Sequence, residues 1–240
     1  MTDRATALRV LSALARTPIG GEAVLVGSSG LFGFPSEVPA LTEDVDISVP
    51  EPIVDQHGPE IVSALVAQGF EHEAGTATFV SGDGITFDLL GHGDPEAGDH
   101  IGGAGVLRVM VFEDISRIVG ELGATAPLPD VGRGLTPAGF VACKLLTERA
   151  HKGSKDKLQA LLVIAERSGE QRFEAELKRL LQAVDPMRLD DVRAGAQDAF
   201  LALGRDPAFA DAGAEGYAPA LRQAERGLEH LIRTLEAIHD

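Results

Sequence analysis

The sequence predicts an α+β protein, in which a small mixed β-sheet domain is followed by an α-helical domain. In the first half, short apolar runs alternate with polar residues at the period of a β-strand. From Thr136 onward this alternation disappears, and Ala, Leu, Glu, Arg and Gln dominate. The stretch 125–135 between the two textures is rich in Pro and Gly. We therefore expect one domain over residues 1–130 and a second over 131–240.

The expected sheet domain begins with a helix over 3–16, where apolar residues recur at helical spacing. Pro18, Gly20 and Gly21 end that pattern. A short apolar strand, EAVLVG, follows and ends at Gly27. Further on we expect a strand over 44–49, a helix over 58–69, strands over 77–81 and 85–91 that form a hairpin around the turn GDG, a strand over 105–112, and a short helix or turn over 113–122.

The second half predicts helices alone, over 136–150, 155–167, 170–183, 188–204 and 217–239. No apolar run in the chain approaches the roughly 18 residues that a membrane span requires. The N-terminus lacks the basic region and apolar core of a secretory signal. The single cysteine, Cys143, is typical of a reducing compartment. We therefore expect a cytoplasmic protein without a membrane partner.

The charge of the chain bears on its partners. Its formal net charge is −16, whereas proteins that bind nucleic acid along a broad surface usually carry an excess of Lys and Arg. A local basic patch is compatible with this total, so the charge disfavours a nucleic-acid partner without excluding one.

Two aspartates in the segment TEDVDIS carry the strongest functional signal. Asp44 and Asp46 alternate with apolar residues in a predicted strand, so both side chains project from the same face, about 6 to 7 Å apart. Two ionised carboxylates at that distance repel by about 2 to 3 kcal/mol at an effective dielectric near 20. Either water screens them on an exposed face, or a cation or strong donors lie between them.

Two further features favour a cation. Asp88 is a lone carboxylate in the apolar run ITFDLLG, where a charge is costly unless it is paired or binds a metal. A third acid on a neighbouring strand would complete an oxygen ligand set suited to Mg²⁺. The turn Gly27-Ser28-Ser29 follows a strand and is expected to open a short helix, where its N–H groups and hydroxyls could hold phosphate oxygens.

The order VGSSGL, TEDVDIS and then ITFDLL resembles the polymerase-beta-type nucleotidyltransferase superfamily. The resemblance implies transfer of a nucleoside monophosphate from a nucleoside triphosphate (NTP) to an acceptor hydroxyl or phosphate, with pyrophosphate leaving and two Mg²⁺ ions assisting. It implies that Asp44 and Asp46 bind both metals and that Asp88 binds the catalytic metal and helps to deprotonate the acceptor. It also implies that Ser28 and Ser29 orient the triphosphate.

The helical segment PAGFVACKLLTERAHKGSKDKLQALLVIA resembles the AbiEii-type nucleotidyltransferases, which are toxins of bacterial abortive-infection and toxin-antitoxin systems. The resemblance implies that Lys144 takes part in catalysis and that Asp156 either orients a lysine or contacts the nucleotide. The nucleotide-binding residues it implies are Gly27, Ser28, Ser29, Thr42, Lys144, Thr147, Arg149, Lys155 and Asp156. The alternative for the basic positions is a solvated face on a pair of helices.

Two departures from the family pattern stand out. The interval from Gly27 to Asp44 is longer than usual, with FGFPSEVPA (32–40) as the additional segment, which either shapes the acceptor side of a pocket or is an inert loop. The basic helix reads Lys-x-x-Thr-x-Arg, a shorter spacing than the family's.

Four functions follow as hypotheses. The first is a toxin that modifies tRNA or another cellular acceptor and is paired with an antitoxin protein. The second is a transferase acting on a small, aminoglycoside-like acceptor, which the acidic charge favours. The third is a housekeeping transferase. The fourth, from a different class, is a catalytically silent module that binds a nucleotide or a partner.

Overall fold

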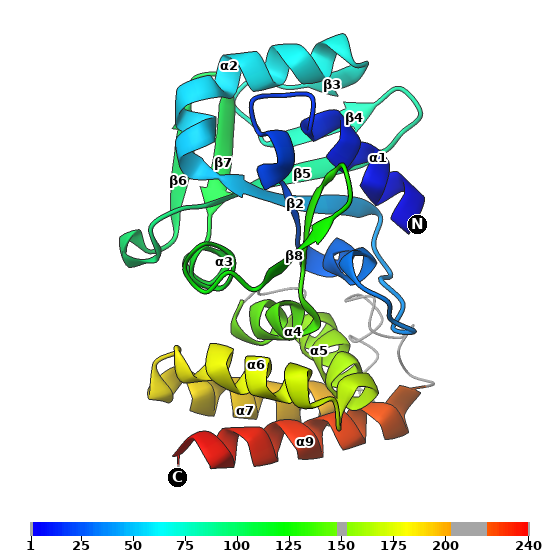
Figure 1. Cartoon of the computed structure of the whole chain (residues 1–240), viewed down its shortest axis with the longest axis vertical. Coiled ribbons are helices and arrows are strands. Elements are labelled where there is room, and N and C mark those ends of the chain that lie inside the picture. The colour runs from blue at the N-terminus through cyan, green and yellow to red at the C-terminus, as the bar shows by residue number, and fades with distance from the viewer. Residues whose placement is uncertain (1, 148–152, 203–219, 240) are drawn as a thin grey trace. The chain divides into compact units, whose positions relative to one another are not determined.

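The computed structural model describes residues 2–147, 153–202 and 220–239. It has the α+β architecture that the sequence predicts (Figure 1). The chain forms two compact units, which are described separately below. The sheet unit contains residues up to Pro35 and 40–136, and the helical unit contains Ser36–Pro39 and the residues from Pro137 onward.

The sheet unit is built on a mixed sheet with strand order β3-β4-β5-β2-β1-β9-β8, and β7 pairs with both β5 and β6. The strands are β1 (Val24–Leu25), β2 (Asp44–Pro50), β3 (Phe70–His72), β4 (Thr78–Ser81), β5 (Thr86–His92), β6 (His100–Ala104), β7 (Leu107–Val111), β8 (Thr125–Leu128) and β9 (Gly132–Leu135). The central strands β2 and β5 run parallel, and β4 and β5 form the expected antiparallel hairpin.

One face of this sheet is covered by the helices α1 (Arg4–Leu14) and α2 (Glu51–Ala67) (Figure 1). The short helical elements of the unit are η1 (Gly20–Glu22), η2 (Gly27–Gly33), η3 (Pro95–Ala97), α3 (Glu113–Ile115) and the π-helix η4 (Ser116–Glu121). The apolar residues of α1 and α2 share one buried core with the strands. This burial is the main stabilising contribution to the unit.

Apolar and acidic side chains alternate along β2, and this alternation determines which face of the sheet carries the acids. Val45, Ile47 and Val49 are fully buried in the core shared with α1 and α2. Because side chains alternate across a strand, Asp44 and Asp46 project from the opposite face. The apolar residues thus fix the orientation of the strand, and the acids face away from the core.

Several elements differ from the sequence prediction. The stretch 125–135 is not an irregular linker, because β8 and β9 form a hairpin there and β9 pairs in parallel with β1. The two units part between Thr136 and Pro137. Helix α2 begins at Glu51 and passes through a kink at His57, whereas a helix was expected only from residue 58. The strands β3 and β6 were not predicted, because β3 has only three residues and β6 contains two adjacent glycines, so neither gives a clear period.

The helical unit contains α4 (Pro137–Leu146), α5 (Gly153–Arg167), α6 (Gln171–Gln182), α7 (Pro186–Ala202) and α9 (Leu221–His239). Each overlaps a predicted helix. In α6 the buried residues Phe173, Leu177, Leu180 and Leu181 recur at helical spacing. Gly227 of α9 lies against the backbone of α5, since a Cβ there would be 1.9 Å from the carbonyl oxygen of Leu161. None of the helices in the described ranges is long and apolar enough to cross a bilayer.

Candidate metal site

Three carboxylates meet on the face of the sheet opposite the core that it shares with α1 and α2. Asp44, Asp46 and Asp88 each present an oxygen atom, and these oxygens all lie within 4.8 Å of one another. The strand register explains the arrangement, because Asp46 pairs directly with Asp88 across the parallel strands β2 and β5, and Asp44 pairs with Thr86. Residues that face each other in register on one face of a sheet have adjacent side chains.

The spacing of these oxygens fits a divalent cation. Two oxygens on opposite sides of an octahedral Mg²⁺ lie about 4 Å apart, since each bond is about 2.1 Å long. The three oxygens lie within 4.8 Å of one another, which is close to this spacing. Without a cation, each pair of charges at this distance repels by about 3 kcal/mol at an effective dielectric near 20. The donor set, which consists of carboxylate oxygens alone, is the set that Mg²⁺ prefers.

Two threonine hydroxyls orient two of the carboxylates. Thr42 donates to Oδ1 of Asp44 at 2.7 Å, and Thr78 on β4 donates to Oδ1 of Asp88 at 2.6 Å. Hydrogen bonds of this kind hold metal ligands in their binding orientation. Thr42 was expected to contact the nucleotide, and the structure gives it a bond to a neighbouring ligand. Thr78 was not predicted, because only the pairing of β4 with β5 brings it opposite Asp88.

The glycine-serine turn adjoins the third carboxylate. The expected short helix is present as η2, which begins at Gly27. Gly27 has a φ of +57°, and a Cβ at this position would lie 1.9 Å from Oδ2 of Asp46. A residue without a side chain therefore lets the turn approach the acid.

The two serines of the turn are buried, with Ser28 6% and Ser29 0% exposed. The Ser29 hydroxyl donates to the carbonyl oxygens of Val26 and Asp46 and accepts from the N–H of Asp46. Ser29 thus joins the turn to β2 through backbone contacts. Its contacts hold the backbone at Asp46, and the role in orienting the triphosphate stays a prediction.

We expect that replacing Thr78 with Val weakens Mn²⁺ or Mg²⁺ binding by about 10-fold, because Asp88 loses the donor that orients it. Valine matches the shape of threonine, so the fold should be kept. Isothermal titration calorimetry with Mn²⁺ would measure the change, and Thr78→Ser should restore binding because it restores the hydroxyl. Equal affinities for the wild type and Thr78→Val would show that the hydrogen bond has no part in the site.

The predicted basic residues lie in the helical unit. Lys144 is 5% exposed, forms an ion pair with Asp156, and has its Nζ 5.8 Å from the centre of the Phe140 ring. Of the two roles predicted for Asp156, the structure places it beside a lysine. Lys157, which was not predicted, is also buried and donates to the carbonyl oxygens of Leu145 and Lys144 near the end of α4. This pattern joins α4 to α5 by buried charge-assisted contacts.

The other residues of the predicted basic motif are Thr147, Arg149 and Lys155. The N–H of Thr147 donates to the carbonyl of Cys143 at 3.0 Å, which continues the hydrogen bonding of α4. Lys155 is half-buried in the first turn of α5. Arg149 lies outside the described residues.

A half-buried histidine lies on the face of the sheet that carries the acids. Nδ1 of His92 is 2.8 Å from the hydroxyl of Ser48, which is fully buried on β2. Ser48 lies two residues after Asp46 on β2, and His92 lies four residues after Asp88 on β5. Both spacings are even, so these side chains share the acidic face. Burial lowers the pKa of His92 to about 4. Its imidazole is therefore neutral at pH 7 and forms a hydrogen bond with the Ser48 hydroxyl.

This lowered pKa predicts an acid-dependent loss of stability. An unfolded histidine has a pKa of about 6.5 and binds a proton more readily than the folded one at about 4. The stability that comes from keeping His92 neutral is therefore fully present above pH 6.5. As the pH falls toward 4, the free energy of unfolding decreases by up to about 3 kcal/mol. Urea denaturation of the wild type and His92→Gln at pH 7 and pH 4.5 would measure it, with His57→Gln as the control. An identical pH dependence in the wild type and His92→Gln would contradict the prediction.

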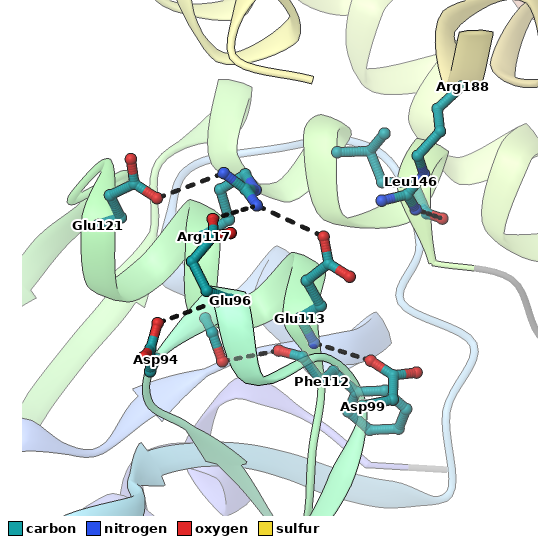
Figure 2. A network of polar contacts seen from close by, with 10 residues as sticks. Asp94, Glu96, Asp99, Phe112, Glu113, Arg117, Glu121, Leu146 and Arg188 are labelled. Atoms are coloured by element: carbon teal, nitrogen blue, oxygen red, sulfur yellow. Dashed lines mark hydrogen bonds and ion pairs between the residues drawn. The ribbon is translucent and has the colours of Figure 1, made fainter. Parts of the chain in front are cut away.

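A second polar cluster, shown in Figure 2, surrounds Arg117 on the π-helix η4. Its guanidinium lies 3.4 Å from carboxylate oxygens of Glu96 and Glu113 and 3.5 Å from one of Glu121. The segment GHGDPEAGDH contains η3 and supplies Glu96. The carboxylates outnumber the arginine three to one, so the cluster is negative. In the helical unit Arg188 separately donates to the carbonyl of Leu146 (Figure 2).

The sequence was compared with models of known protein families and with curated proteins. No family model matches the chain, and no curated protein matches it significantly.

Proposed function

We propose that the protein is a Mg²⁺-dependent nucleotidyltransferase, which moves a nucleoside monophosphate from an NTP to an acceptor hydroxyl or phosphate. The observation that carries the proposal is the meeting of three carboxylates within 4.8 Å beside the Gly27 turn. Acids that only form salt bridges or cover an exposed surface have no need to lie this close to one another. Three acids on two parallel strands, two of them held by threonine hydroxyls, are typical of a site that binds a divalent cation and phosphate oxygens.

In the proposed reaction an acceptor oxygen attacks the α-phosphorus, the bond from that phosphorus to the bridging oxygen breaks, and pyrophosphate carries away the electron pair. Asp44 and Asp46 would hold two Mg²⁺ ions, with Asp88 as a further ligand of the catalytic one. When bound, the ions would neutralise charge at the attacking and leaving oxygens. Asp88, which is held by Thr78 and partly exposed, accepts the proton of the acceptor hydroxyl.

The acceptor distinguishes two versions of this function. The resemblance to AbiEii-type enzymes favours a toxin that modifies tRNA and has an antitoxin partner in the cytoplasm. The carboxylates around Arg117 (Figure 2) favour instead a small cationic acceptor, because a negative surface attracts cations and repels a phosphate backbone. We place the toxin first, because the segment around Lys144 and Asp156 extends the resemblance beyond the acids.

One assay tests the transferase and separates it from a silent binding module. The full chain is incubated with each α-³²P-labelled NTP and Mg²⁺, in the presence of bulk tRNA, an aminoglycoside such as kanamycin, or neither. We expect pyrophosphate release and EDTA-sensitive transfer of label to one acceptor. NTP binding without pyrophosphate release from any combination would support the silent module and overturn the transferase.

A further inference from the structure

The loop between the glycine-serine turn and the acidic strand is bound by the helical unit. Its four central residues, Ser36–Pro39, group with that unit, although the chain on both sides belongs to the sheet unit. We call these four residues the strap. Glu166, near the end of α5, accepts a hydrogen bond from the hydroxyl of Ser36 at 2.6 Å and from the N–H of Glu37 at 2.8 Å. One carboxylate thus uses both of its oxygens to hold the strap.

The strap is also stiffened from within. The Ser36 hydroxyl accepts from the N–H of Val38 at 3.1 Å, and the Val38 side chain is buried. Pro35 precedes the strap and Pro39 ends it, and each proline fixes its own φ and restricts the residue before it. Such a segment moves as a piece, so holding its centre restrains both of its ends.

Both ends of the loop lead to the metal site. On one side, Gly33 ends η2 and packs against Gly134 of β9, since a Cβ on Gly33 would lie 3.1 Å from the Cα of Gly134. On the other side, the backbone around Thr42 is held by Thr2, whose N–H donates to the Thr42 carbonyl at 2.8 Å. Thr42 in turn orients Asp44. A short chain therefore connects the strap to a ligand of the proposed metal.

We propose that Glu166 is a positioning residue for this site, which acts by holding the strap and thereby restricting Thr42 and Asp44. The proposal rests on the proposed function in that it treats Asp44 as a metal ligand. It gives the additional segment 32–40 a purpose: the segment makes the geometry of the metal site depend on the helical unit. An inert loop would not need a carboxylate of α5 to hold it, and neither would a loop that only contacts the acceptor.

The test compares Glu166→Gln with Glu170→Gln in the full chain. Glutamine keeps the size of Glu166, but it has a single acceptor oxygen and lacks the negative charge, so it cannot hold both donors as the carboxylate does. Glu170 is a matched control, because it lies just beyond the same helix and pairs with Arg167 at 3.1 Å without contact to the strap. The measurements are amide hydrogen exchange in the absence of metal, Mn²⁺ affinity by calorimetry, and transfer kinetics.

In Glu166→Gln we expect the amides of residues 36–44 to exchange about 10-fold faster, with the rest of the sheet unit unchanged. The Mn²⁺ dissociation constant should rise about 10-fold, as it does when groups that orient metal ligands are removed. The kcat should fall by a similar factor, with little change in KM for the NTP. A purely structural role would instead accelerate exchange throughout the helical unit. Glu170→Gln should match the wild type in each measurement.

If Glu166→Gln fails to fold, Ser36→Ala replaces it, because this change removes one of the two bonds from the loop side. Exchange and Mn²⁺ affinity that equal those of Glu170→Gln would overturn the role of Glu166. The two proposals fail separately: a wild type without transfer activity, in which Glu166→Gln still weakens Mn²⁺ binding, removes the transferase and keeps the strap. If the wild type is active and Glu166→Gln is equally active, the transferase proposal stands and the role of Glu166 is overturned.

Discussion

Replacing Asp46 with Asn is expected to lower kcat/KM for nucleotidyl transfer by about 10³-fold or more, which corresponds to about 4 kcal/mol of transition-state stabilisation. Asp46 is 9% exposed and lies between the Gly27 turn and Asp88, so it is the acid most enclosed by the site. Asparagine has nearly the same shape and lacks the charge that a cation requires. The measurement is steady-state transfer of label with the purified variant.

The same change should affect stability in the opposite direction. In the metal-free protein, removing one of three mutually repelling charges should raise the free energy of unfolding by about 1 to 3 kcal/mol. A variant that is more stable yet inactive would separate loss of the site from loss of the fold. Asp83→Asn is the control, because Asp83 is exposed and pairs with Arg9 away from the cluster. Undiminished transfer by Asp46→Asn would show that the three acids do not form the active site.

Replacing Gly27 with Ala is expected to weaken Mn²⁺ binding by at least about 100-fold, because the new methyl group must displace the carboxylate of Asp46. The Cβ would lie 1.9 Å from Oδ2, 2.6 Å from Cγ and 2.9 Å from Cβ of Asp46, so the whole side chain has to move. The positive φ of +57° adds backbone strain of about 1 to 2 kcal/mol. Calorimetry with Mn²⁺ and urea denaturation would measure the two effects.

Gly20 provides a matched control for this prediction. Its φ is +58°, and a Cβ at Gly20 would meet nothing within 4 Å. Gly20→Ala therefore carries the same backbone strain without the displacement of an acid, and we expect a loss of about 1 kcal/mol of stability with unchanged Mn²⁺ affinity. If both alanine variants bind Mn²⁺ as the wild type does, the close approach of the turn to Asp46 is not needed for the site.

Local pattern was sufficient to predict the acidic strand. The alternation of Asp44 and Asp46 with Val45 and Ile47 predicted a strand with two unlike faces, and the structure confirms that strand. The period of a side chain along a strand is a local property, so it can be read from the chain itself. The lone charge of Asp88 in an apolar strand predicted a partner in the same way, because a buried charge must be compensated.

Local pattern was not sufficient for the residues that support the acids. Thr78 reaches Asp88 only through the register of β4 and β5, and Ser29 turns to the backbone of β2. A hydroxyl can bond to a ligand, to a neighbouring carboxylate or to a main-chain group, and the sequence contains no signal that selects among these. The strands β8 and β9 in the stretch 125–135 were not predicted for a related reason, since Pro and Gly suit both a loop and the parallel pairing of β9 with β1.

The sequence by itself therefore determined the class of the fold, the course of the central strands and the identity of the three acids, because these follow from periodicity and from the cost of burying charge. Only the tertiary structure decided that the acids meet within 4.8 Å, that Lys144 pairs with Asp156, and that Glu166 holds the strap. These contacts join residues far apart in the chain or on different elements. Their formation depends on strand register and helix packing, which many distant residues set together.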